Sequence, residues 1–277
     1  MRFPRIRFTL RSAFAVSTVC AVFLGLLKSA LDRYESEWSE EQAALSRIPW
    51  PAHDPVIERN VPIILRPFLT QRKLTTFDRV VGLDMGGDTS DKYVKNLRSF
   101  TRLKQLSLMD YRCTDQSMGT VSSLKGLEKL DLSVTNVTDA GVRELGCLEN
   151  LRDLNLSETR ISGKSLRILG TIKTLGTLRL VGTKVRDHDL APLANLRDLH
   201  VLDVAQTDIT DAAVPYLLQC SHLECLRVYE THLSAGAVFA LGEMPSLKRL
   251  VVSRRTFTND EIKTLEKRIV RPILVWQ

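Results

Sequence analysis

The feature of this sequence that most constrains its fold is an internal repeat of 24 residues. The leucines that open the units recur without a gap at Leu103, Leu127, Leu151, Leu175, Leu199, Leu223 and Leu247. A fixed period of this length is typical of chains in which small supersecondary units stack on one another. The repeat therefore predicts a solenoid, and not a compact globule, for this part of the chain.

Each unit has two halves that differ in the spacing of their apolar residues. The first half reads L-x-x-L-x-L/V, as at Leu151, Leu154 and Leu156, and its alternation predicts a short strand. The second half has helical spacing. Its apolar positions form two ladders along the chain: Met118, Val142, Leu166, Leu190, Val214, Val238 and Ile262, and then Val121, Leu145, Leu169, Leu193, Leu217, Leu241 and Leu265. Strand and helix are expected to face one core.

Small hydroxyl residues mark the boundaries between these halves. A threonine recurs after each strand, at Thr135, Thr159, Thr183, Thr207 and Thr231. A turning backbone leaves polar groups that such side chains can satisfy, so we expect these threonines to be buried and structural. Thr138-Asp139 and Thr210-Asp211 predict helix starts, because the hydroxyl caps free N–H groups and the carboxylate suits the helix dipole.

A single unit cannot fold alone, because its few apolar side chains stabilise it by less than the entropy cost of ordering its backbone. Neighbouring units must cover its two open faces and share hydrogen bonds with it. The expected result is a stack whose parallel strands line the inside of a curve.

These residues resemble the leucine-rich repeat, in the subtype with a threonine ladder that is similar to the cysteine-containing repeats. The best example runs from Leu199 through Leu202, Val204 and Thr207 to Asp211, and the match covers residues 103 to 267. The resemblance implies an α/β fold, a right-handed β/α horseshoe or arc with a parallel sheet on its concave face. The departures are Tyr111 and Arg255 in place of the ladder threonine, and Gly163 in place of the aspartate after Ser162.

Residues 1–31 predict a basic flank followed by a membrane-targeting segment. The apolar run 13–27 follows four arginines, Arg2, Arg5, Arg7 and Arg11, a charge order that keeps the N-terminus in the cytoplasm. Fifteen residues rise only about 22 Å as a helix, a length that fits a signal peptide. Because Leu27-Lys28-Ser29-Ala30 offers no A-x-A cleavage site, an uncleaved single-pass anchor with the repeats outside the cytoplasm is favoured. With this leader the chain resembles bacterial membrane-anchored leucine-rich-repeat proteins.

The remaining sequence divides into two further regions. Residues 32–78 predict a charged stalk and an irregular N-terminal cap, which is interrupted at Pro51, Pro55, Pro62 and Pro67. Residues 79–277 predict the repeat domain: a degenerate repeat at 79–102, seven repeats at 103–270 and a C-terminal capping strand at 271–277.

Charge and motifs argue against nucleic-acid binding and catalysis. The formal charge is +7, but Arg2, Arg5, Arg7, Arg11 and Lys28 contribute five of these charges, which leaves the rest near balance. Gly163-Lys164-Ser165 resembles the end of a phosphate-binding loop but lacks its first glycine, since Glu158 stands there. The histidines, at His53, His188, His200, His222 and His232, fall at unrelated repeat positions and are expected to be solvated. We therefore expect no enzyme, no metal site and no cofactor.

The outward strand residues form the candidate binding surface, because the ladder residues are expected to pack in the core. The candidate ligand-binding residues are Asp131, Asn155, Arg179, Asp203, Arg227, Tyr229 and Arg249. Arginine and tyrosine are enriched at protein-binding hot spots, so this cluster predicts a contact site. The alternative interpretation is an ordinary solvated face with no single focus.

The leading functional hypothesis is a monomeric, membrane-tethered, non-catalytic scaffold that binds an unknown protein on its concave face. One alternative is a carbohydrate or cell-wall binding module, in which Tyr229 would stack on sugars. Another is an intracellular substrate-recognition (adaptor) subunit, which would need a cytosolic location and an adaptor-binding segment.

Overall fold

The computed structural model describes residues 10–47, 55–59, 78–85, 90–269 and 274–277. The chain forms two compact units: Met1–Ala43 with Glu58–Arg79, and Ala44–Ile57 with Val80–Gln277. Pro51, Pro62, Pro67 and His53, on which the sequence analysis drew, lie outside the described residues.

The first helix, α1 (Leu10–Leu45), corrects the prediction of a membrane anchor. Among the residues that the structure describes, no helix has a stretch both long and apolar enough to cross a membrane. The apolar run 13–27 would rise only about 22 Å, against a hydrocarbon core of roughly 30 Å. Beyond this run α1 continues into the charged segment 32–41. The predicted membrane location, single-pass with the N-terminus in the cytoplasm and the repeats outside, is therefore wrong.

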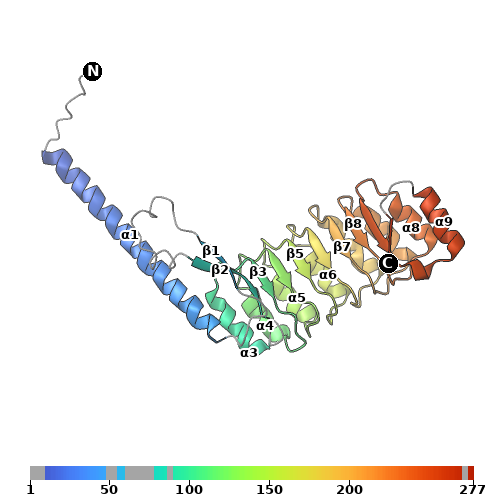
Figure 1. Cartoon of the computed structure of the whole chain (residues 1–277), viewed down its shortest axis with the longest axis horizontal. Helices are drawn as coiled ribbons and strands as arrows, with labels where there is room; N and C mark the ends of the chain where they lie inside the picture. The colour runs from blue at the N-terminus through green and yellow to red at the C-terminus, as the bar shows by residue number, and fades with distance from the viewer. Residues whose placement is uncertain (1–9, 48–54, 60–77, 86–89, 270–273) are drawn as a thin grey trace, which may run out of the picture. The chain divides into compact units, whose positions relative to one another are not determined.

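One ten-stranded sheet contains the repeat strands in chain order (Figure 1). Strands β2 to β10 pair in parallel, and from β3 to β9 each residue lies opposite the one 24 positions later, as Leu106, Leu130 and Leu154 do. The strands are β1 (Val56–Arg59), β2 (Asp78–Asp84), β3 (Gln105–Ser107), β4 (Lys129–Asp131), β5 (Asp153–Asn155), β6 (Thr177–Arg179), β7 (Val201–Asp203), β8 (Cys225–Arg227), β9 (Arg249–Val252) and β10 (Leu274–Trp276).

Helical segments of the repeats form a second layer against this sheet (Figure 1). They are α3 (Asp91–Val94), η3 (Lys95–Ser99), α4 (Asp115–Val121), α5 (Asp139–Leu145), α6 (Gly163–Leu169), η4 (Asp187–Asn195), η5 (Asp211–Ala213), α7 (Val214–Gln219), α8 (Ala235–Gly242), η6 (Arg254–Thr256) and α9 (Asn259–Arg268). Strands stack about 4.8 Å apart and helices about 8 to 10 Å apart, so the sheet lies on the inside of the curve.

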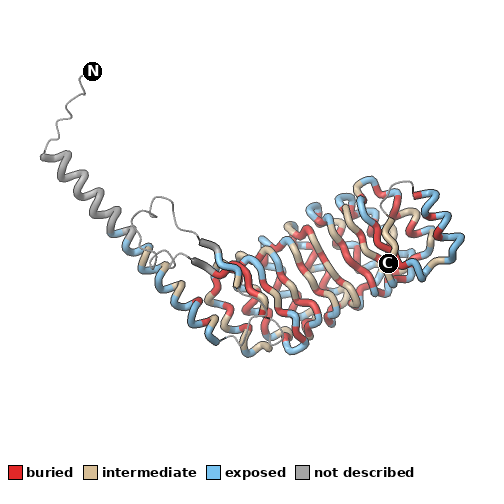
Figure 2. The backbone as a smooth tube through the Cα atoms, viewed as in Figure 1, coloured by how far each residue is buried: buried red, intermediate tan, exposed pale blue. Residues whose placement is uncertain are grey.

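The core between the two layers follows both predicted ladders (Figure 2). Every ladder residue is buried except Val214, which is only half-buried while the adjacent Ala213 is fully buried. The reason is local: η5 is a 3₁₀ turn, whose three residues per turn shift the inward position by one residue. In η4, Pro192 lies inside the segment and cannot donate a helical N–H, and this segment is also 3₁₀.

The threonine ladder is confirmed as buried and structural. Each of its five hydroxyls donates to the carbonyl three residues earlier, as Thr207 does to Val204 at 2.6 Å. The residue before each threonine has a positive φ, between 53° and 66°, which turns the chain out of the strand. These positions are Val134, Glu158, Gly182, Gln206 and Glu230.

The predicted helix caps at Thr138 and Thr210 are confirmed, Thr114 and Ser162 cap their helices in the same way, and aspartates at the helix starts link successive repeats. Asp115 accepts hydrogen bonds from the backbone N–H and the hydroxyl of Thr138, at 2.8 and 2.6 Å. The same pair of bonds joins Asp91 to Thr114, Asp139 to Ser162, Asp187 to Thr210 and Asp211 to Ser234. The sequence predicted a dipole role for these carboxylates, and the bonds between repeats add a second one.

Candidate functional site

The concave face consists of the outward side chains of the sheet, arranged in rows by the parallel register. One row contains five of the seven predicted site residues: Asp131, Asn155, Arg179, Asp203 and Arg227. Arg249 lies in the neighbouring row, opposite Cys225, and Tyr229 follows Arg227 by two residues. Strand alternation therefore brings six of the seven to one side of the sheet, and Tyr229 lies in the turn after β8.

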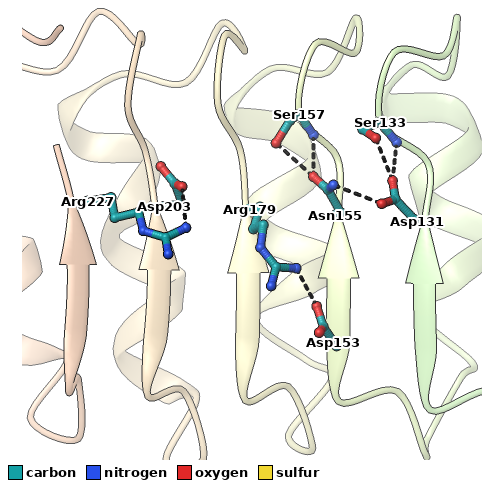
Figure 3. Close-up of polar contacts among 8 residues, drawn as sticks. All are labelled: Asp131, Ser133, Asp153, Asn155, Ser157, Arg179, Asp203 and Arg227. Carbon is teal, nitrogen blue, oxygen red and sulfur yellow. Dashed lines mark hydrogen bonds and ion pairs between the residues drawn. The ribbon is translucent and has the colours of Figure 1, made fainter. Parts of the chain in front are cut away.

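Arg179 is fixed by an ion pair that the sequence analysis missed. Its Nη1 donates to Asp153 Oδ1 at 2.7 Å, and both side chains are about a third exposed (Figure 3). Asp153 lies in the row that begins at Gln105, two residues before Asn155 on the same strand. Extending the outward alternation one step back along each strand would have identified it.

Arg227 has an equivalent partner in Asp203, directly opposite on the adjacent strand (Figure 3). The distance from Nη1 to Oδ2 is 3.2 Å, and Asp203 is 3% exposed. Its second oxygen accepts the backbone N–H of Ala205 at 3.2 Å. Asp203 thus fixes the position of the Arg227 guanidinium, and little of the Asp203 side chain is accessible to a partner.

Asp131 and Asn155 bond mainly within the sheet (Figure 3). Asp131 Oδ1 accepts the N–H and the hydroxyl of Ser133 at 2.8 and 2.6 Å, and Asn155 Oδ1 accepts the same pair from Ser157 at 3.1 and 2.7 Å. The amide nitrogen of Asn155 also donates to Asp131 Oδ2 at 3.1 Å. These two side chains close the strand ends and join neighbouring repeats.

Tyr229 is half-buried beside the Asp203–Arg227 pair. Burial raises the pKa of its phenol, and the nearby carboxylate of Asp203 raises it further. The phenol is therefore neutral at physiological pH and can both donate and accept a hydrogen bond.

A groove of about 320 Å³ lies over the N-terminal half of the concave face. Of the predicted site residues, Asp131, Asn155 and Arg179 line it, while the other four lie outside it. The groove also contains Asp84, Gln105, Lys129 and Asp153, and Val56 of β1 lines it as well. Its position could not be read from the repeat, because β1 and β2 lie outside the regular 24-residue pattern.

The family model described as a leucine-rich repeat region matches residues 71–269. The chain belongs to the leucine-rich repeat family. Among solved structures, this leucine-rich repeat chain is similar to an internalin C2 of Listeria monocytogenes, at 23% identity with a TM-score of 0.50 over 66% of this chain and 84% of that one. None of the curated proteins matches the sequence.

An internalin (inlF) of Listeria monocytogenes gives a TM-score of 0.51 at 21% identity, over 70% of this chain and 60% of that one. This chain thus spans less than two thirds of that protein. At these identities the likeness confirms the fold, an α/β leucine-rich-repeat solenoid with a parallel sheet.

Nucleophiles of the leucine-rich repeat domain are either buried or scattered. Burial raises the pKa of the Cys113 thiol to about 12 and that of Cys220 to about 11, which makes both poor nucleophiles at neutral pH. The four histidines in the described part of the chain are exposed, as predicted: His188, His200, His222 and His232. Within the described ranges, no group of three or more His, Cys, Asp or Glu residues could hold a metal ion.

Proposed function

We propose that this leucine-rich repeat chain is a non-catalytic scaffold that binds another protein on its concave face. The observation that carries the proposal is that Arg179 and Arg227 are both partly exposed and held in place by ion pairs. Each arginine side chain is about a third exposed, and its guanidinium is anchored through one nitrogen, to Asp153 or to Asp203. A guanidinium has five N–H donors in a rigid fork, so the remaining donors of each are available to a partner.

Preorganised arginines of this kind suit protein recognition. Their side chains lose little further freedom when a partner binds, because an ion pair already holds them in place. Tyr229 beside Arg227 adds an aromatic surface, and Arg249 is exposed in the next row. Tyrosine and arginine are the residues that most often dominate protein interfaces.

Affinity capture with the full chain tests this function. Proteins retained by the wild type are identified by quantitative mass spectrometry and compared with those retained by Arg227→Ala, Tyr229→Ala and Arg227→Lys. Recovery of a specific partner is expected to fall at least about tenfold with each alanine variant, the effect of losing roughly 1.4 kcal/mol of contact. Arg227→Lys keeps the charge but loses the fork, so it should also weaken capture.

The matched control is Arg167→Ala, which removes an exposed arginine from α6 in the helical layer. It should capture the partner as well as the wild type. Unchanged recovery with Arg227→Ala and Tyr229→Ala, after circular dichroism has verified their fold, would refute the concave face as the binding surface.

A further inference from the structure

Three large side chains follow the ends of β3 and β4, and two of them depart from the repeat pattern. Met109, Tyr111 and Val134 are large and apolar or aromatic, and we refer to them as the rim patch. One repeat later the same positions hold Ser133, Thr135 and Glu158. The other repeats have small or polar residues at the Tyr111 and Val134 positions, whereas the Met109 position also holds Val181 and Tyr229 in later repeats.

The rim patch is exposed. Met109, Tyr111 and Val134 have exposed fractions of 51%, 66% and 47%, and among the described residues they make up half of the large hydrophobic side chains that are exposed. Tyr111 occupies the ladder position at which Thr135 is buried, and a tyrosine ring is too large for that site. Single exposed apolar residues are ordinary, but a cluster of them marks an interaction surface.

Backbone bonds bring the two turns of the rim patch side by side. The N–H of Asn136 donates to the carbonyl of Cys113 at 2.9 Å, and its side-chain amide donates to the carbonyl of Tyr111 at 2.5 Å. The guanidinium of Arg112 lies 5.7 Å from the centre of the Tyr111 ring and pairs with Asp110 at 3.0 Å. Methionine, tyrosine and arginine are all enriched at protein interfaces.

Val134 also has an unfavourable backbone conformation. Its φ is 57°, in the left-handed region that β-branched residues almost never adopt. Glycine occupies the equivalent position at Gly182, and the other repeats have Glu158, Gln206 and Glu230 there. An exposed apolar side chain kept in a strained conformation indicates that something other than stability maintains it.

The rim patch continues from the groove of the concave face. Ser107 at the end of β3 and Asp131 at the end of β4 line the groove, and Met109 and Ser133 follow them two residues later. The groove contains three carboxylates and two cations: Asp84, Asp131, Asp153, Lys129 and Arg179. Asp131 accepts only from neutral donors, and no described basic side chain lies within ion-pair distance of it. The charge that complements Asp131 is therefore positive.

We propose that the groove and the rim patch together bind an extended segment of a partner protein that carries a basic side chain and, two residues away, a large apolar side chain. Two residues of extended chain span about 6.6 Å, and two residues also separate Asp131, the last residue of β4, from Ser133 in the turn that follows. The basic group would pair with Asp131, and the apolar group would cover Met109, Tyr111 and Val134. This inference rests on the proposed function, namely that the concave face binds protein.

Labelled nonapeptides test the required chemistry directly. Peptides containing Lys-x-Leu or Leu-x-Lys in a serine and threonine background are titrated into the full chain and followed by fluorescence polarisation. The peptide of the two that binds more tightly should bind about tenfold better than the same peptide with Glu in place of Lys. It should also bind about tenfold better than the same peptide with Ser in place of Leu. Equal affinity for all peptides, or no binding of any of them, would overturn the inference.

Variants built from the repeat itself locate the binding. Met109→Ser, Tyr111→Thr and Val134→Gln introduce residues found at the same positions in other repeats, namely Ser133, Thr135 and Gln206. Their thermal midpoints should equal or exceed that of the wild type, while the preference for leucine is lost. Asp131→Asn copies Asn155, which makes the same bonds to its serine, and should lose the preference for lysine together with the hydrogen bond from Asn155 Nδ2.

The outcomes distinguish a failure of this inference from a failure of the proposed protein-binding function. Wild-type peptide selectivity in both sets of variants would mean that the rim patch and Asp131 are not the site. If at the same time Arg227→Ala still lost its captured partner, the protein-binding function would stand and only this inference would fail.

Discussion

A single buried hydroxyl of the threonine ladder has a measurable effect on stability. Thr207 is 4% exposed and donates to the carbonyl of Val204 at 2.6 Å. Thr207→Val keeps the side-chain shape and removes the donor, so the free energy of unfolding should fall by about 1 to 3 kcal/mol. Urea denaturation followed by circular dichroism measures the change.

Thr171 offers a matched control outside the ladder. Its hydroxyl also donates to the carbonyl three residues earlier, Ile168, at 2.6 Å, but the residue is exposed. Water replaces the lost bond in Thr171→Val, and the expected change lies within about 0.5 kcal/mol. Equal losses at Thr171 and Thr207 would contradict the role of burial.

Asp139 makes one junction between repeats sensitive to acid. Burial raises the pKa of its carboxyl, but hydrogen bonds from Ser162 and Ser165 outweigh burial, and the net pKa is lowered. A folded-state pKa below the unfolded one adds stability above the unfolded pKa, about 3.9, and this stability is lost as the pH falls through the folded pKa.

Comparing the wild type with Asp139→Asn isolates this contribution. The wild type should be the more stable of the two at about pH 6, and the difference should shrink as the pH falls from about 5 to about 2. Urea titrations at each pH give the two free energies. A difference that stays constant with pH would show that the ionised carboxylate is not what stabilises this junction.

At the scale of the element, Gly163 is explained by a residue in the next repeat. The starts of α4, α5, η4 and η5 each carry an aspartate that bonds to the following cap, whereas α6 has Gly163 there and the N–H of Arg186 donates to Asp189 Oδ2 at 2.9 Å. A Cβ atom on Gly163 would collide with that same carboxylate. Asp189 thus takes over the bond and the space of the missing aspartate, which the sequence analysis recorded only as an irregularity.

Alanine at position 163 should therefore destabilise the fold, although replacing a helical glycine by alanine usually stabilises a protein. Gly163→Ala should cost about 1 to 3 kcal/mol through overpacking, and Asp189→Ala in the same chain should recover part of the loss. The control is Gly119→Ala in α4, where a Cβ meets nothing within 4 Å, so helix propensity alone should stabilise by up to about 1 kcal/mol. Additive effects of Gly163→Ala and Asp189→Ala would refute the proposed contact.

Most elements could be predicted because the period fixes them. The alternation predicted the strands from β3 to β9, and the capping hydroxyls predicted the helix starts. The 3₁₀ character of η4 was not predicted, although Pro192 stood in its centre. Strand β1 was not predicted either, because Val56–Arg59 is a short segment outside the repeat, and its pairing depends on the tertiary structure.

At the scale of the whole molecule, the side of the sheet on which the site residues lie was predictable, but their hydrogen bonds and ion pairs were not. Register placed Asp131 and Arg179 on the concave face, yet their hydrogen-bond partners depend on rotamers that no pattern encodes. Asp153 and Lys129 were not predicted, although they lie in the same row as the predicted Arg249. The membrane prediction failed for another reason, since it inferred an anchor from the absence of a cleavage site although the apolar run is short.

Two buried thiols in different repeats report whether the whole arc unfolds as one unit. Cys113 and Cys220 are buried, with pKa values raised to about 12 and about 11, so both should resist alkylation while the fold is intact. Parallel pairing runs unbroken between their repeats, and each repeat stabilises its neighbour. Pulsed alkylation at increasing urea should therefore label both thiols over the same narrow range, while the exposed Cys147 reacts without urea. Labelling of Cys113 at clearly lower urea than Cys220 would mean that the N-terminal repeats open separately, and that the groove lies on a less stable part of the sheet than Arg227 and Tyr229.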